Sequence, residues 1–307
     1  HSSQSGEAAR HMRKALSLEE AAQKDVPGKD LDDVIADEIR KKGQQANISQ
    51  FAFTATPKPK TIELFGTLKN GKKDAFDVYT MEQAIKEGFI IDVLDNYMSF
   101  KRYYKLIKRS DSKDLEYDKK KTVRVLGNYV DLQDHAIEKK ARIILEHFTS
   151  VTQNKIQGQA RGMLVTKSRL HAVRFKRKFD DVMREMKLPY EALVAFSGTV
   201  KDDETGEEYT ENSMNDLGGR MSIPDALKLP KYRLLIVANK FQTGFDEPMM
   251  HTMFVDKKLG GTSTVQTLSR LNRCAKGKSS TMILDFVNDP ELIQEDFQDH
   301  YGKNFIQ

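Results

Sequence analysis

The sequence has little cysteine and no long apolar run, and both absences narrow the class of protein. Its only cysteine, Cys274, excludes a disulfide framework and is typical of a reducing compartment. No apolar run approaches the ~18 residues that a membrane-spanning helix needs. The first residues, His1 to Gly6, lack the charged and apolar regions of a signal peptide and follow no Met. We therefore expect a cytoplasmic protein whose chain starts here within a longer one.

A strong excess of one charge is also lacking. The 307 residues contain 50 Lys and Arg against 45 Asp and Glu, so the net charge is only +5. Charged residues make up 31% and hydrophobic residues 38%, which is typical of a globular protein large enough for two domains. None of the seven histidines lies at metal-ligand spacing from cysteine or acidic residues, so no metal site is predicted.

The first part of the chain is predicted to contain two surface helices, over residues 7–22 and 32–42, because apolar residues recur there at helical spacing. Residues 48–53 have the composition of a buried strand. Thr54-Ala55-Thr56 follows directly, and hydroxyls in this position are placed to contact a ligand at the carboxyl edge of a sheet. Taken alone, these three residues are more simply interpreted as a strand end at which the threonine hydroxyls form hydrogen bonds within the protein.

Turn and capping residues organise the next stretch. Asn70-Gly71 predicts a β-hairpin between extended runs at residues 62–68 and 76–79. Thr80 and Gln83 form a capping box, which predicts an amphipathic helix that continues to Tyr97.

A basic segment and a further helix come before the second half. Residues 101–121 contain nine Lys or Arg with three interleaved tyrosines. This composition suits a nucleic-acid backbone, and it also suits a solvated linker. Residues 131–148 have a helical apolar stripe, and we expect a domain boundary nearby.

From residue 162 onward, short apolar runs alternate with helical patterns, which predicts a parallel sheet covered on both faces. The predicted strands are residues 163–166, 192–196, 234–238, 252–255 and 281–286. Lys167-Ser168-Arg169 is predicted to begin a long basic helix, and the acidic stretch 202–211 is predicted to be irregular.

Two stretches carry candidate site residues. The strand at 234–238 runs into a polar loop at residues 239–246, and ligands bind where such strands end. Gln266, Arg270 and Arg273 lie at offsets of four and three residues, so a helix capped by Ser263 would present all three on one face. Two guanidinium groups aimed the same way suit a polyphosphate. Taken alone, the two arginines are equally compatible with a solvated helix face.

In this order the motifs resemble the second motor domain of superfamily 2 helicases and translocases. The amino-acid sequences of these motifs resemble even more closely those of the restriction (motor) subunits of type I restriction-modification enzymes. The matching stretches are Phe53-Thr-Ala-Thr-Pro-Lys58, Gln83-Ala-Ile-Lys-Glu-Gly-Phe-Ile90, Ile236-Val-Ala-Asn-Lys-Phe-Gln-Thr-Gly-Phe-Asp-Glu-Pro248 and Val265-Gln-Thr-Leu-Ser-Arg-Leu-Asn-Arg273.

This resemblance implies an α/β fold with a RecA-like parallel sheet covered by helices, of the P-loop NTPase-like type. It places the end of a first motor domain at residues 1–70 and a hairpin and helical connecting segment at residues 71–150. The second motor domain would occupy residues 151–290, and a carboxyl-terminal helical region would start at residues 291–307.

The resemblance also implies residue roles. Arg270 and Arg273 would reach the phosphates of ATP across an interdomain cleft, and Gln266 would sense the nucleotide. Gly244 and Asp246 would couple that cleft to DNA. His1 would be the last residue of the Asp-Glu-x-His box, and Thr54-Ala55-Thr56 would transmit domain closure. The candidates for contacts with DNA phosphates, without base readout, are Lys167, Ser168, Asn239, Lys240 and Thr243.

The implied activity is coupling of ATP hydrolysis to double-stranded DNA translocation before cleavage by an ATP-dependent endonuclease. Mg²⁺ would accompany ATP, and the methyltransferase and specificity subunits would be partners. The family's Gly-Lys-Thr loop, the two acids of its Mg box and its nuclease domain are absent from these residues, so we expect the chain alone to be inactive.

Two alternatives remain. One is another superfamily 2 DNA helicase or translocase. The other is a non-enzymatic DNA-binding module that uses the basic residues at 101–121 and 167–187. A salt-dependent DNA affinity that Arg270→Ala leaves unchanged would favour the module, because counterion release depends on phosphate contacts alone.

Overall fold

The computed structural model describes residues 51, 53, 59–103, 137–202, 205–218, 221–241 and 245–301. The chain divides into two compact units, residues 1–79 and 80–307. The predicted helices at 7–22 and 32–42 and most of the basic segment 101–121 lie outside the described residues. The predicted domain limits at residues 70, 150 and 290 remain predictions.

The first unit contains a short helix and the predicted hairpin. Strands β1 (Thr67–Lys69) and β2 (Lys72–Asp74) pair antiparallel around Asn70 and Gly71. These two residues have φ angles of 50° and 79°, the left-handed conformation that a two-residue hairpin turn requires. The hairpin prediction is therefore confirmed at this turn.

The elements predicted around the hairpin are partly wrong. Residues 62–65, expected to be extended, belong to helix α3 (Pro59–Phe65), and no strand occupies residues 76–79. Phe51 and Phe53, the described residues of the strand predicted at 48–53, lie outside any strand and are 81% and 93% exposed. Apolar composition alone did not separate strand from helix or coil in these short runs.

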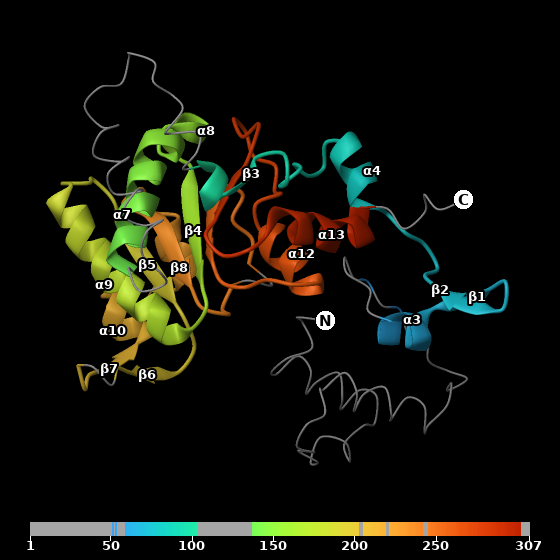
Figure 1. The fold of residues 1–307 in the computed structure, drawn as a ribbon, viewed down its shortest axis with the longest axis horizontal. Helices are drawn as coiled ribbons and strands as arrows, with labels where there is room; N and C mark the ends of the chain where they lie inside the picture. Colours follow the sequence, from blue (N-terminus) through green and yellow to red (C-terminus); the bar gives the residue numbers. More distant parts are fainter. Residues whose placement is uncertain are drawn as a thin grey trace. The chain divides into compact units, whose positions relative to one another are not determined.

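The second unit is built on a six-stranded sheet in which every pairing is parallel, with strand order β3-β10-β9-β4-β8-β5 (Figure 1). The strands are β3 (Tyr97–Ser99), β4 (Arg161–Thr166), β5 (Glu191–Ala195), β8 (Tyr232–Val237), β9 (Met250–Asp256) and β10 (Met282–Asp285). All residues of β4 and β9 are buried, because both faces of the sheet are covered. The predicted α/β fold is confirmed.

Helices cover the two faces of the sheet. The helical segments of this unit are α4 (Met81–Lys86), α7 (Ile137–His147), the π-helical turn η3 (Phe148–Thr152), α8 (Lys155–Gly158), α9 (Arg169–Glu185), α10 (Glu211–Asn215), α11 (Ile223–Leu227), α12 (Thr262–Leu268) and α13 (Pro290–Tyr301). Successive strand residues point to opposite faces, so Leu164 packs in the cluster under α7 and α9, whereas Met163 and Val165 pack in the cluster of α11, α12 and α13. Figure 1 shows α7 and α9 on one side of the sheet and α12 and α13 on the other.

Three local predictions for this unit need correction. The capping box of Thr80 and Gln83 is present, but helix α4 ends at Lys86, because Gly88 takes a φ of 75°. Tyr97, predicted as the end of that helix, begins strand β3. The stretch 202–211, predicted to be irregular, includes part of a hairpin between β6 (Thr199–Lys201) and β7 (Glu208–Thr210) and the start of α10.

Gly162 shows how tightly this sheet is packed. A Cβ atom at Gly162 would lie 2.8 Å from Cδ2 of Leu234 and 3.1 Å from Cδ2 of Phe148. Both neighbours are completely buried. We expect Gly162→Ala to lower the free energy of unfolding by about 1–3 kcal/mol, as overpacking does. Urea unfolding of the 307-residue chain, followed by far-UV circular dichroism, measures this change.

Gly260→Ala is the matched control, because a Cβ there would meet nothing within 4 Å. The two substitutions add the same atoms. Equal unfolding midpoints for the two variants would contradict the packing described for Gly162.

Candidate functional site

The predicted site residues in the described part of the second unit follow the carboxyl ends of the parallel strands, or lie in helix α12 and the turn after it. Lys167 and Ser168 come after β4, Asn239 and Lys240 after β8, and Asp246 in the connection from β8 to β9. His1, Thr54, Ala55, Thr56, Thr243 and Gly244 lie outside the described residues. Their positions remain predictions.

The segment that carries the two arginines is not the helix that the spacing predicted. Helix α12 begins after Gly261 rather than at a Ser263 cap, and it ends at Leu268. The chain then turns through contacts three residues apart, in which the N–H groups of Arg270 and Leu271 donate to the carbonyls of Thr267 and Leu268. Gln266 is therefore in the helix, whereas Arg270 and Arg273 lie in a tighter turn beyond it.

Both arginines nevertheless reach the same connection between β8 and β9. Arg270 donates from Nη1 to the Phe245 carbonyl at 2.9 Å and from Nε to the Gln266 carbonyl at 3.2 Å. Arg273 donates from Nε to Oδ1 of Asp246 at 3.1 Å. The structure thus brings Arg270 and Arg273 together at the neighbouring residues Phe245 and Asp246. The prediction that both arginines lie on one helical face is wrong.

The two arginines differ in their surroundings. Arg270 is partly buried, and this burial, followed by the like charge of Arg273, lowers the pKa of Arg270. It still stays protonated, because guanidinium does not lose its proton in proteins. The side chains of Arg273 and Asp246 are 47% and 69% exposed, so their ion pair adds little to stability. Arg270 is held in place, and Arg273 is more exposed.

A segment that the sequence did not single out as part of the site contacts this turn. The backbone of Ile90 forms an antiparallel bridge with Arg273, and the Ile91 N–H donates to the Asn272 carbonyl at 2.9 Å. The Cys274 thiol lies 3.4 Å from the Gly88 carbonyl. Residues 88–91 therefore support the arginine turn through contacts with residues 272–274. No local sequence pattern predicts these contacts.

The chain leaving β8 is conformationally unusual. Asn239 and Phe241 both take a φ of 63°, the left-handed conformation that is uncommon for residues other than glycine. Oδ1 of Asn239 accepts a hydrogen bond from Lys257 Nζ at 2.7 Å. Backbone in this conformation is often found at functional sites.

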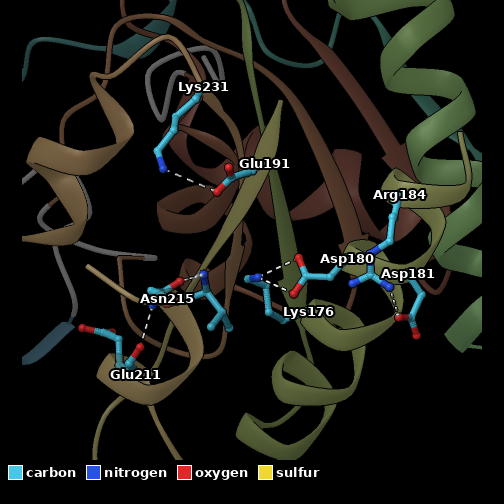
Figure 2. Close-up of polar contacts among 9 residues, drawn as sticks. Lys176, Asp180, Asp181, Arg184, Glu191, Glu211, Asn215 and Lys231 are labelled. Carbon is cyan, nitrogen blue, oxygen red and sulfur yellow. Dashed lines mark hydrogen bonds and ion pairs between the residues drawn. The ribbon is translucent and has the colours of Figure 1, made fainter. Parts of the chain in front are cut away.

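Lys240, predicted to contact DNA, has an acidic partner in this structure. Its Nζ lies 2.8 Å from both carboxylate oxygens of Glu211, and the same carboxylate accepts from the Phe196 N–H at 3.0 Å. Asn215 donates to the Glu211 carbonyl and to the Val194 carbonyl, which attaches α10 to the end of β5 (Figure 2). Contact with a phosphate would have to compete with this ion pair.

The long helix predicted to begin at Lys167-Ser168-Arg169 is present after β4, and Ser168 caps it. Ser168 Oγ accepts from the His171 N–H at 3.2 Å and lies 2.8 Å from Nδ1 of the same ring, so it caps the 17-residue helix α9. Burial, followed by the charge of Lys167, lowers the pKa of His171. Thr166 Oγ1 donates to the Val237 carbonyl at 3.0 Å, which joins the exits of β4 and β8. Lys167 is exposed next to this cap.

A buried ion pair lies at the end of β9. Lys140 of α7 reaches Oδ1 of Asp256 at 2.6 Å, and the two side chains are only 7% and 5% exposed. No local sequence pattern predicts this pair, because its members are 116 residues apart. In the described part of the chain, no group of three His, Cys, Asp or Glu side chains could hold a metal ion. Within the same ranges, every helix is too short or too polar to cross a membrane.

Comparisons of sequence identify relatives. The family model described as Type I restriction enzyme subunit R domain 3 matches residues 89–288. The chain is 26% identical over 261 residues to a putative type I restriction enzyme MjaIXP endonuclease subunit of Methanocaldococcus jannaschii, covering 78% of this chain and 23% of that protein. It is 24% identical over 313 residues to the SauMRSORF196P endonuclease subunit of Staphylococcus aureus, covering 85% of this chain and 32% of that protein. The chain thus spans about a quarter to a third of the length of these relatives.

Solved structures also match. One is a fragment of a putative HsdR subunit of a type I restriction enzyme from Vibrio vulnificus, with a TM-score of 0.42 at 16% identity, covering 80% of this chain and 39% of that one. Another is the ATP-dependent Type ISP restriction-modification enzyme LlaBIII bound to DNA, with a TM-score of 0.38 at 13% identity, covering 72% of this chain and 14% of that one.

Proposed function

The chain belongs to the family of type I restriction enzyme R subunits, and on this premise we propose that it forms part of an ATP-driven DNA motor. Arg270 and Arg273 act on the phosphates of ATP, and hydrolysis is coupled to translocation of double-stranded DNA before cleavage. The observation that carries this proposal is the convergence of the two guanidinium groups on Phe245 and Asp246.

The chemistry of these donors suits a polyphosphate. Arg270 uses Nε and Nη1 for backbone carbonyls, and no acceptor for its Nη2 is found among the described residues. Two cations lie close enough for Arg273 to lower the pKa of Arg270, and Asp246 supplies only one negative charge between them. An anionic ligand would offset this repulsion, and planar guanidinium groups bind phosphate oxygens bidentately.

In this proposal ATP supplies the phosphoryl group and Mg²⁺ arrives with it. Arg270 and Arg273 stabilise the negative charge that develops on the phosphate oxygens, and Gln266 of α12 contacts the nucleotide. Gly244 and Asp246 belong to the nucleotide-binding residues and couple them to DNA. His1 acts with the catalytic residues, and Thr54-Ala55-Thr56 transmits domain closure.

DNA contacts are proposed for the exits of β4 and β8. Lys167 and Ser168 lie at the amino end of α9, where a helix favours phosphate, and Asn239, Lys240 and Thr243 follow β8. These contacts are with the backbone and carry no sequence information. Recognition of a DNA site would then fall to the specificity subunit of a complex that also contains the methyltransferase.

The test is the double variant Arg270→Ala, Arg273→Ala in the full-length subunit assembled with its partners. We expect loss of DNA-stimulated ATP hydrolysis while salt-dependent DNA binding persists, because the phosphate contacts to DNA come from other residues. Lys228→Ala is the control, because its side chain is 70% exposed, lies outside the proposed sites and pairs with the exposed Asp225. Full ATP turnover by the double variant would overturn the proposed role of the arginines. The 307-residue chain alone, which lacks a Gly-Lys-Thr loop, is expected to show no turnover.

A further inference from the structure

Lys278 lies at the centre of three backbone carbonyl groups. It is only 8% exposed, and its Nζ donates to the carbonyl oxygens of Leu271 at 2.7 Å, Arg273 at 2.8 Å and Pro248 at 3.1 Å. An ammonium group has three N–H donors and no acceptor, so each of its donors has a partner.

The three carbonyls belong to the two segments that form the arginine site. Leu271 and Arg273 lie in the turn that carries the guanidinium groups. Pro248 lies two residues after Asp246, in the segment that supplies the acceptors of both arginines. One ammonium therefore ties the turn to the connection between β8 and β9.

The connection between β8 and β9 is itself anchored to the sheet through Glu247. Glu247 is buried, and its Oε1 accepts from Arg161 Nη1 at 3.1 Å and from the Met249 N–H at 3.0 Å. Arg161 begins strand β4 in the middle of the sheet. The arginine turn is thus connected to the sheet by hydrogen bonds from Lys278 to Pro248 and from Arg161 to Glu247.

Burying the Lys278 ammonium costs desolvation free energy, which an apolar side chain in the same place would not. Burial lowers the pKa of Lys278 to about 8, while the nearby Cys274 and Glu247 raise it and Arg273 lowers it further. His251 also faces this charge, and its own pKa is lowered to about 4, first by burial and then by Lys278. A neutral amine would have only two donors and would leave one of the three carbonyls without its hydrogen bond.

We propose that the ammonium of Lys278 is a positioning group that sets Arg270 and Arg273 for the nucleotide. This inference rests on the proposed function, because it concerns the same arginines. Lys278 does not touch the reacting atoms. It acts through the backbone of Leu271 and Arg273.

The experiment compares Lys278→Met, Lys278→Arg and wild type in the full-length subunit within its complex, with DNA-stimulated ATP hydrolysis as the readout. Lys276→Met is the matched control, since Lys276 is an exposed lysine of the same loop. We expect Lys278→Met to lower kcat by about 100-fold, the effect of misplacing a catalytic group by about 1 Å, with a much smaller change in the KM for ATP. Lys278→Arg keeps the charge and is expected to restore most of kcat.

The pH profile supplies a readout that does not depend on Lys278→Met folding. Lys278 loses its proton as the pH rises through about 8, whereas an arginine there stays charged. The ratio of wild-type kcat to that of Lys278→Arg is therefore expected to fall between pH 7 and pH 9.5. A constant ratio, or wild-type kcat in Lys278→Met, would overturn the inference.

Arg270→Ala, measured in parallel, separates this inference from the function on which it rests. If Arg270→Ala retains ATP hydrolysis, the proposed function fails. If Arg270→Ala loses hydrolysis and Lys278→Met keeps it, the function stands and only the role of Lys278 is wrong.

Discussion

Arg270→Lys in the full-length subunit is expected to lower kcat for DNA-stimulated ATP hydrolysis by about 10³-fold, the lower end of what a catalytic arginine contributes to phosphoryl transfer. Lysine keeps the positive charge but loses the planar fork. In this structure Nε and Nη1 hold the Gln266 and Phe245 carbonyls, and the remaining edge of the guanidinium is left for a ligand. A single ammonium cannot keep both carbonyls and a phosphate in that geometry.

Arg273→Lys is the informative comparison. Arg273 is more exposed and makes one side-chain hydrogen bond, to Asp246, among the described residues. Arg273 is held by fewer guanidinium hydrogen bonds than Arg270. We therefore expect Arg273→Lys to retain more activity than Arg270→Lys. Steady-state kinetics over a range of ATP concentrations measures both variants. An Arg270→Lys variant within threefold of wild type would show that charge alone, and not the guanidinium geometry, is needed.

Asp256→Ala is expected to lower the free energy of unfolding by about 3–5 kcal/mol, because it removes one member of the buried ion pair with Lys140. Nζ of Lys140 and Oδ1 of Asp256 are 2.6 Å apart, and both side chains are excluded from solvent. The lost attraction acts where water cannot replace it. Urea unfolding of the 307-residue chain at neutral pH, monitored by far-UV circular dichroism, gives the change in stability.

An exposed ion pair of the same helix provides the control. Glu138 of α7 pairs with Lys178 at 3.3 Å, with side chains that are 60% and 44% exposed. Glu138→Ala is expected to change the unfolding free energy by no more than about 1 kcal/mol. The double variant Lys140→Met, Asp256→Leu removes both charges and is expected to recover most of the loss. Equal effects of Asp256→Ala and Glu138→Ala would contradict the burial described here.

Local signals were sufficient where one physical requirement dominates. Strand β8 is a continuous apolar run because a central parallel strand is covered on both faces, and the sequence predicted it within two residues. The start of α9 was predicted at Lys167-Ser168-Arg169, and in the structure the Ser168 hydroxyl satisfies an unpaired helical N–H there. Asn70-Gly71 was identified as a hairpin turn because both positions need left-handed backbone.

Predictions failed where contacts distant in sequence decide the outcome. The pattern from Gln266 to Arg273 is compatible with a helix, and the chain leaves that helix at Leu268. Lys278 donates to the Leu271 and Arg273 carbonyls, and the Ile91 N–H donates to the Asn272 carbonyl, so contacts with distant segments hold the chain beyond Leu268 in its turn. Spacing cannot reveal these contacts, because they involve partners up to 181 residues away (272 − 91).

The sequence by itself determined the α/β class, the order of the strands along the chain, and the candidate site residues Gln266, Arg270, Arg273 and Asp246, because apolar periodicity and motif wording are local properties. Only the tertiary structure decided how the arginines are presented. They converge on Phe245 and Asp246 from a turn and not from a helical face, with Lys278 and residues 88–91 supporting that turn. The reason is physical: a buried carbonyl takes the donor that the folded chain brings to it, and that donor is fixed by packing between segments far apart in the sequence.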